Sequence, residues 1–122
     1  MTPTTIYRAG DVVLTPFPYA DQSGEKKRPV VLLSSDRVSL DTGLHIACMI
    51  TSHAPRGPWD VEVLAWQEAG LLFPSVVRCP EVFGLDQSLI LRQLGRLAMS
   101  DWGRRRGASQ VSLRGVPRRP PG

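Results

Sequence analysis

The chain has 122 residues and a net charge of +4, from 15 basic and 11 acidic side chains. This length predicts one domain with a modest core, and no second domain is expected. No run of about twenty apolar residues could span a bilayer, and the first ten residues lack the apolar centre of a secretory signal. We therefore expect a cytoplasmic protein that does not contact a membrane.

The positive charge is concentrated at the C-terminal end. Residues 103–122 contain six arginines and no acid, so residues 1–102 carry nine basic and eleven acidic side chains, a net charge of −2. The C-terminal segment is rich in Arg, Gly, Ser and Pro, a composition that predicts disorder. We divide the chain into one folded domain, residues 1–102, and a basic tail, residues 103–122. The tail is either a solvated extension or a non-specific clamp on RNA phosphates.

The first predicted elements are a strand, a polar loop and a second strand. The β-branched run Val12–Thr15 ends before a proline, which has no N–H to donate to a strand ladder. After a loop of turn-forming residues, Pro29 holds Arg28 out of the helical region. The apolar run Val30–Leu33 then predicts a buried strand. An arginine is thus fixed at the mouth of a rigid strand, where it is suited to holding a phosphate.

Further short strands follow along the chain. Residues 36–43 favour a turn or a single helical turn. Apolar runs and period-two alternation predict strands at His45–Ile50, Asp60–Leu64, Ser75–Cys79 and Leu94–Leu97. Pro80 is expected to end the third of these, although Val82 and Phe83 can continue it beyond a kink.

The remaining signals are weaker. Residues 86–92 fit either a strand edge or a turn of helix. Ser100 and Asp101 predict the start of a brief helix anchored by Trp102. Many short strands joined by Gly- and Pro-rich turns, with little helix, predict a small barrel of mainly β structure, although the pattern also allows other β architectures.

The cysteines and histidines do not form a metal-binding pattern. Cys48 and Cys79 lie inside apolar runs and are interpreted as buried thiols rather than a disulfide. Neither they nor the two histidines show the close spacing of metal ligands, and the acidic residues do not cluster. We expect no metal and no cofactor.

Four stretches of the chain occur together and in order. Gly10–Ser35 reads GDVVLTPFPYADQSGEKKRPVVLLSS, and Met49–Ser52, Gly70–Cys79 and Leu94–Leu97 follow it. Together they resemble the MazF/PemK family of type II toxin–antitoxin ribonucleases over about residues 10–102. The resemblance implies an SH3-like barrel with small helices (mainly β, α+β) that forms a homodimer. It also implies a toxin that cleaves single-stranded RNA at specific sequences without metal, leaves 2′,3′-cyclic phosphate and 5′-hydroxyl ends, and is controlled by a cognate antitoxin protein.

The resemblance also assigns two catalytic positions. The family has an arginine just before the proline of the second strand and a threonine at the end of the third, which match Arg28 and Thr51. A fixed guanidinium would stabilise the charge that develops on the phosphorane, and the threonine hydroxyl would position the phosphate. The alternative is structural: Arg28 covers a strand edge and Thr51 closes a turn.

Four more residues are candidates for supporting roles. Ser52 and His53 follow Thr51, and His53 is either a general acid or base or an idle, exposed side chain. Arg78 stands in an apolar strand and needs a partner or a phosphate. Relatives resembling PemK have an acid directly after V-R-C, whereas here Glu81 comes one place later. That shift would turn Glu81 to the opposite face of a strand unless a bulge intervenes.

The first loop supplies candidates for RNA binding. Phe17 and Tyr19 are suited to stacking on bases, or else are core and turn residues. Lys26 and Lys27 would meet phosphates as point charges. The Phe83-Gly84 pair departs from the family pattern, as does Pro80. These departures keep open the alternative of a barrel that binds RNA or an antitoxin without cleaving.

Overall fold

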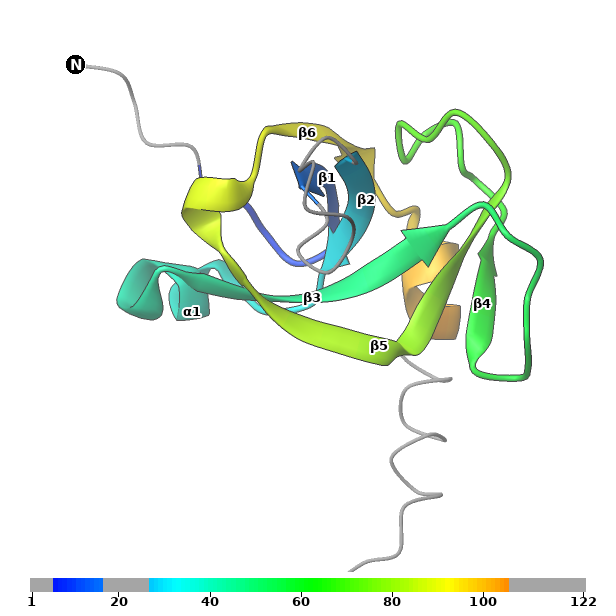
Figure 1. The fold of residues 1–122 in the computed structure, drawn as a ribbon, viewed down its shortest axis with the longest axis horizontal. Helices are drawn as coiled ribbons and strands as arrows, with labels where there is room; N and C mark the ends of the chain where they lie inside the picture. The colour runs from blue at the N-terminus through cyan, green and yellow to red at the C-terminus, as the bar shows by residue number, and fades with distance from the viewer. Residues whose placement is uncertain (1–5, 17–26, 106–122) are drawn as a thin grey trace, which may run out of the picture.

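A computed structural model describes residues 6–16 and 27–105 of the chain. In chain order its elements are β1 (Asp11–Pro16), β2 (Lys27–Leu32), α1 (Asp36–Thr42), β3 (Leu44–Thr51), β4 (Asp60–Val63), β5 (Ser75–Asp86), the 3-10 helix η1 (Gln87–Leu89) and β6 (Arg92–Arg96). A last helical segment covers residues 99–105 and extends to the end of the described residues (Figure 1). Within the described ranges, no helix is long and apolar enough to cross a membrane.

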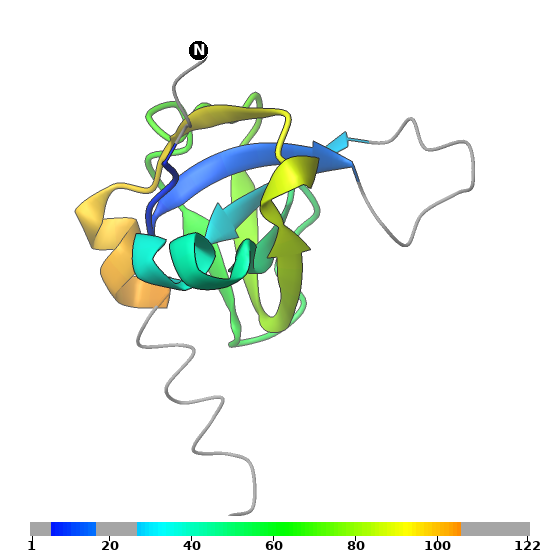
Figure 2. The same ribbon diagram turned by 90° about the vertical axis from the view of Figure 1, so that its left-hand side faces the viewer.

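The strands form one antiparallel sheet in the order β4-β5-β3-β2-β1-β6. The sheet is curled, with β3 and β5 along one side and β1, β2 and β6 along the other, as Figures 1 and 2 show. β2 packs beside β3 with Val31 opposite Cys48, so the second and third strands of the chain are direct neighbours. The predicted mainly β architecture with small helices is confirmed.

The helix α1 is longer than the turn predicted for this segment. It spans seven residues and ends at Gly43, which adopts the left-handed conformation (φ 74°) and donates its N–H to the Ser39 carbonyl at 2.7 Å. A glycine tolerates this backbone conformation without a steric penalty. The buried Ser39 hydroxyl also donates to the Asp36 carbonyl at 2.9 Å, which closes the first turn.

Pro80 does not end β5, so that prediction is wrong and the alternative of a continued strand is confirmed. The β3–β5 register changes from Ile50 opposite Val77 to Cys48 opposite Val82. Residues 78–81 therefore bulge out of the ladder at one position of β3. A proline is compatible with a bulge because no ladder hydrogen bond is required of its nitrogen there.

Residues 86–92 include both of the alternatives predicted for them, strand ends and a turn of helix. β5 runs to Asp86, one turn of 3-10 helix follows, and β6 begins at Arg92. The Asp86 carboxylate accepts hydrogen bonds from the Ser88 hydroxyl at 2.7 Å and the Ser88 N–H at 2.8 Å. The hydroxyl and then the backbone N–H of Ser88 lower the pKa of Asp86, because both bonds favour the charged carboxylate.

Apolar side chains are buried on both faces of the curled sheet. One cluster includes Val12, Val31, Cys48, Val77 and Cys79, and the other includes Val13, Val30, Leu32, Ala47 and Leu85. Both cysteines are buried and free, which confirms the prediction. Burial, followed by the nearby Cys79, raises the pKa of the Cys48 thiol to about 12.

The C-terminal helix fixes the segment between β4 and β5. The Asp101 side chain is 1% exposed and accepts hydrogen bonds from the backbone N–H groups of Leu64 at 3.1 Å and Ala65 at 3.0 Å, and it also pairs with Arg104. The Arg105 guanidinium lies 4.3 Å from the centroid of the Trp102 ring. The turn that follows β4 is therefore attached to the helix, which begins within one residue of the predicted start.

The same segment also packs directly against β6. At Gly70 (φ 76°), an added Cβ would lie 2.0 Å from the Leu94 carbonyl oxygen. At Gly95, an added Cβ would lie 2.6 Å from the Glu68 carbonyl oxygen. The two backbones approach each other this closely only because both positions are glycines.

Candidate functional site

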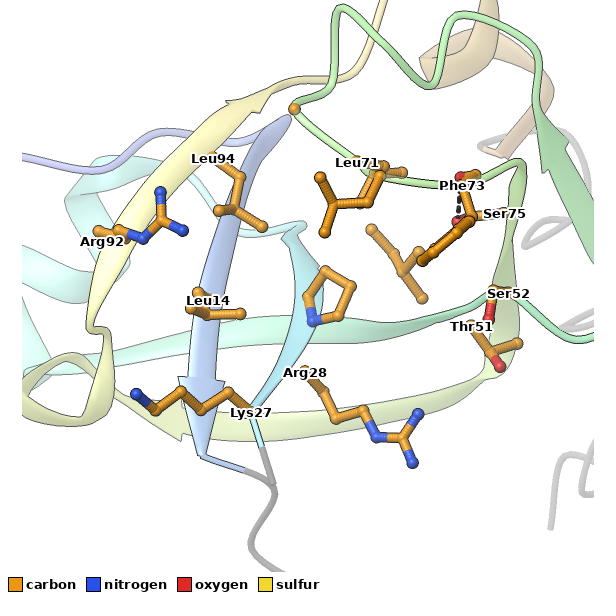
Figure 3. A pocket seen from close by; sticks show the side chains of 14 residues that line it. Leu14, Lys27, Arg28, Thr51, Ser52, Leu71, Phe73, Ser75, Arg92 and Leu94 are labelled. Atoms are coloured by element: carbon orange, nitrogen blue, oxygen red, sulfur yellow. Dashed lines mark hydrogen bonds between the residues drawn. The ribbon is translucent and has the colours of Figure 1, made fainter. Parts of the chain in front are cut away.

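An open cavity of about 450 Å³ lies where the ends of β1, β2 and β3 meet the segment before β5 (Figure 3). We call it the phosphate cavity. Its lining comprises Leu14, Lys27, Arg28, Pro29, Ile50, Thr51, Ser52, Gly70, Leu71, Leu72, Phe73, Ser75, Arg92 and Leu94.

The lining of the phosphate cavity combines an apolar surface with three cationic side chains. Most of it is apolar, and Lys27, Arg28 and Arg92 add positive charge. Figure 3 shows Arg28 and Thr51 on one side of the cavity, and Lys27 and Arg92 on the other. Of the described residues that line the cavity, none is acidic. This combination attracts an anion that also carries apolar groups.

The pairing of β2 with β3 brings Arg28 and Thr51 together. The antiparallel register places Val30 opposite Met49 and Val31 opposite Cys48. The paired residues end at Val30 and Met49, and Arg28 and Thr51 each lie two residues beyond that end on their own strand. The two residues that the resemblance selects, 23 positions apart in sequence, thus both line the phosphate cavity.

The Thr51 hydroxyl is oriented by the backbone that follows it. Its Oγ1 accepts a hydrogen bond from the His53 N–H at 3.2 Å. This short turn is typical of threonine at the end of a strand. Because the hydroxyl oxygen is used as an acceptor here, its proton is available for donation to a bound phosphate oxygen.

The structure brings some predicted site residues together and separates others. Lys27, Arg28, Thr51 and Ser52 share the phosphate cavity. His53 lines a second cavity of about 320 Å³, which shares Ser52 and Ser75 with the first. The candidates Phe17, Tyr19 and Lys26 lie outside the described residues.

Arg78 and Glu81 line neither cavity. The bulge in β5 brings them together, so that Arg78 Nη2 lies 3.2 Å from Glu81 Oε1. Arg78 Nε also lies 3.9 Å from Asp60 Oδ1. The charge of Arg78 is therefore balanced by two carboxylates, that of Asp60 on β4 and that of Glu81 on β5.

Sequence reasoning missed part of the site. Arg92 falls in residues 86–92, for which strand and helix were not separated, and its place beside Lys27 depends on the β1–β6 pairing. Phe73 is 64% exposed and Leu72 is 83% exposed, which is unusual for large apolar side chains next to a strand. Their only sequence signal was membership of the Gly70–Cys79 stretch.

Metal ligands are not grouped in the described structure. Among residues 6–16 and 27–105, no three or more His, Cys, Asp or Glu side chains are arranged to hold a metal ion.

Comparison with known proteins agrees with the fold and the sequence stretches. Residues 8–104 match the family described as PemK-like, MazF-like toxin of type II toxin–antitoxin system. Among curated proteins, none matches the chain. A structure of MazF from Deinococcus radiodurans is 30% identical with a TM-score of 0.72, and the match covers 93% of this chain and 100% of that one.

Two other solved structures show the same architecture. In a MazE–MazF structure from Deinococcus radiodurans the matched chain is 27% identical with a TM-score of 0.74, covering 92% of this chain and all of that one. The Mycobacterium tuberculosis toxin MazF-mt6 is 23% identical with a TM-score of 0.70, covering 85% and 96%, and supports the fold alone. The chain belongs to the PemK-like, MazF-like toxin family of type II toxin–antitoxin systems.

Proposed function

We propose that this toxin is a metal-independent endoribonuclease that cleaves single-stranded RNA at specific sequences in the phosphate cavity. The observation that carries the proposal is the placement of Arg28 and Thr51 on one side of a cavity that two further cations also line. The apolar lining between them accommodates sugar and base, which single-stranded RNA exposes.

Cleavage begins when a 2′-oxygen attacks the neighbouring phosphorus. The 2′-O–P bond forms, the P–O5′ bond breaks, and the products end in a 2′,3′-cyclic phosphate and a 5′-hydroxyl. The Arg28 guanidinium stabilises the charge of the phosphorane, and the Thr51 hydroxyl donates to one of its oxygens. Both groups are fixed on strands, so little reorganisation is required when the charge develops.

The reaction also requires removal of the 2′-proton and protonation of the leaving 5′-oxygen. His53 is the titratable side chain nearest to Thr51 along β3 and its following loop, and we assign it to proton transfer. Ser52 extends the hydroxyl surface next to Thr51. Arg78 and Glu81 line neither cavity and pair with each other in β5, so we assign them a structural role rather than a step of the reaction.

The toxin is proposed to act in the cytoplasm as a homodimer held inactive by a cognate antitoxin. The support for an antitoxin partner is the MazE–MazF structure from Deinococcus radiodurans, in which the matched chain is 27% identical to this one. The described lining of the phosphate cavity has three cationic side chains and no acidic one, so it would also bind an acidic antitoxin segment. The same cavity would then serve RNA and antitoxin in turn.

The direct test is cleavage of a long single-stranded RNA by purified, antitoxin-free protein in EDTA, with the 5′ ends of fragments mapped. Wild-type protein should cut at one short motif, whereas Arg28→Ala and Thr51→Ala should each lose at least about 100-fold in rate. Arg37→Ala is the matched control, because Arg37 is exposed and, among the residues that the structure describes, forms an ion pair only with Asp41 on its own helix. Intact RNA bound by folded wild-type protein would instead support the non-cleaving barrel, for which Pro80 and the Phe83-Gly84 pair are the sequence arguments.

A further inference from the structure

The second cavity adjoins the phosphate cavity, since the two share lining residues. It has a volume of about 320 Å³ and shares Ser52 and Ser75 with its neighbour. Its other lining residues come from the loop after β3, from β4 and the turn after it, and from the start of β5. We call it the Glu62 cavity.

Strand pairing fixes the position of Glu62 relative to Thr51. Thr51 lies opposite Val76 on β5, and Val76 lies opposite Glu62 on β4. Residues that pair directly across antiparallel strands point to the same face, so Thr51 and Glu62 face the same side. Two strand spacings separate their backbones by roughly 10 Å, a distance comparable with the size of one nucleotide.

The two cavities differ in charge. The phosphate cavity is lined by three cations and no acid among the described residues, whereas the described lining of the Glu62 cavity includes Glu62 and His53 but no Lys or Arg. A carboxylate repels phosphate. The chemistry of the second cavity therefore fits the uncharged part of a nucleotide, its base.

The Glu62 carboxylate is available to a ligand. Within residues 6–16 and 27–105 it has no hydrogen-bond or ion-pair partner, and only the Glu62 backbone carbonyl is used, by Arg104 Nη2 at 3.1 Å. An ionised carboxylate accepts hydrogen bonds but cannot donate them. Next to it, the half-buried Trp66 and the exposed His53 supply rings against which a base can pack.

We propose that the Glu62 cavity binds one RNA base beside the scissile phosphate and selects a base with an exocyclic amino group. Glu62 accepts hydrogen bonds from the amino N–H of cytosine, adenine or guanine. Uracil presents two carbonyl oxygens on either side of its single ring N–H, and these oxygens face the carboxylate unfavourably. This inference rests on the proposed function for the position of the phosphate and adds a specificity-determining residue to it.

The test compares wild-type protein with Glu62→Gln on a random-sequence RNA pool, with the sequences around every cut determined. Wild-type protein should reject uracil at one position next to the cut, and Glu62→Gln should reduce that rejection by about tenfold without changing preferences elsewhere. Glu68→Gln is the matched control, because Glu68 lies exposed in the turn after β4 and lines neither cavity. Urea unfolding of all three proteins checks that the fold is retained.

Binding to a 2′-fluoro RNA pool separates this inference from the cleavage proposal, since 2′-fluoro RNA cannot attack its own phosphate. Loss of a base preference in bound sequences with Glu62→Gln, but not with Glu68→Gln, would support the inference even if wild-type protein cleaves nothing. Identical sequence preferences for wild-type and Glu62→Gln proteins would overturn it, as would acceptance of uracil at every position near the cut.

Discussion

The Glu81 carboxylate lies 3.2 Å from the Arg78 guanidinium, within the bulge of β5 and outside both cavities. Because this ion pair does not reach the phosphate cavity, we expect Glu81→Gln to keep kcat/KM for RNA cleavage within about threefold of wild type. Glu81 is 45% exposed, so the stability loss should stay below about 1 kcal/mol. Single-turnover cleavage and urea unfolding measure the two effects, and a 100-fold loss of rate would place Glu81 in the chemistry.

Lys27 and Arg92 are expected to bind flanking phosphates rather than the reacting one, since they lie across the cavity from Arg28 and Thr51. Lys27→Ala and Arg92→Ala should raise KM several-fold with little change in kcat. Each should also make the plot of log binding affinity against log salt concentration less steep by roughly 0.7, the contribution of one phosphate contact to a single strand. Arg37→Ala should leave both quantities unchanged, and an unaltered salt slope in the first two variants would contradict their assignment.

Gly70 is held against the Leu94 carbonyl, so Gly70→Ala should destabilise the fold by more than about 2 kcal/mol through backbone clash and a strained left-handed conformation. Gly84→Ala provides the comparison, because nothing lies within 4 Å of an added Cβ there and its φ is not positive. That variant should stay within about 0.5 kcal/mol of wild type. Urea denaturation measures the stability loss of both variants. Equal losses would show that the close contact between Gly70 and β6 does not restrict the side chain at position 70.

Asp101→Ala should cost about 2 kcal/mol, because the N–H groups of Leu64 and Ala65 lose their acceptor. The segment that begins at Leu64 supplies lining residues to both cavities, so the rate of RNA cleavage should fall as well. Asp41→Ala removes a carboxylate that forms an exposed ion pair with Arg37, and it should cost under about 0.5 kcal/mol. Thermal unfolding of the two variants compares their losses of stability. Equal losses would show that Asp101 contributes no more than an exposed surface charge.

Burial raises the pKa of the Cys48 thiol to about 12 in the folded state, compared with 9.0 for an unperturbed thiol. Between these values the unfolded state releases the proton more readily, so stability should fall as pH rises from about 9 toward about 12. Below pH 9 neither state ionises and this effect is absent. Stability measured against pH for wild type and Cys48→Ala should show a shallower decline in the variant, whereas parallel curves would contradict a buried, neutral thiol.

Local sequence signals located most of the secondary structure because each depends on neighbouring residues. Period-two alternation and β-branched runs predicted the strands, and Ser100-Asp101 predicted the last helix within one residue. The prediction that Pro80 ends a strand was wrong, because a proline does so only where its nitrogen would have to donate a hydrogen bond to the neighbouring strand. Residues 78–81 are not paired with β3, so no such bond is required of Pro80. The length of α1 was underestimated because its C-cap depends on the left-handed Gly43.

The sequence by itself determined the family and the mainly β fold and indicated Arg28 and Thr51 as candidate site residues, because these follow from residue types in a fixed order along the chain. Only the tertiary structure decided which side chains share a cavity. Pairing of β1 with β6 brought Arg92 beside Lys27, the bulge in β5 paired Arg78 with Glu81, and pairing of β4 with β5 set Glu62 in line with Thr51. These contacts join residues far apart in sequence, and their register depends on the packing of the whole sheet.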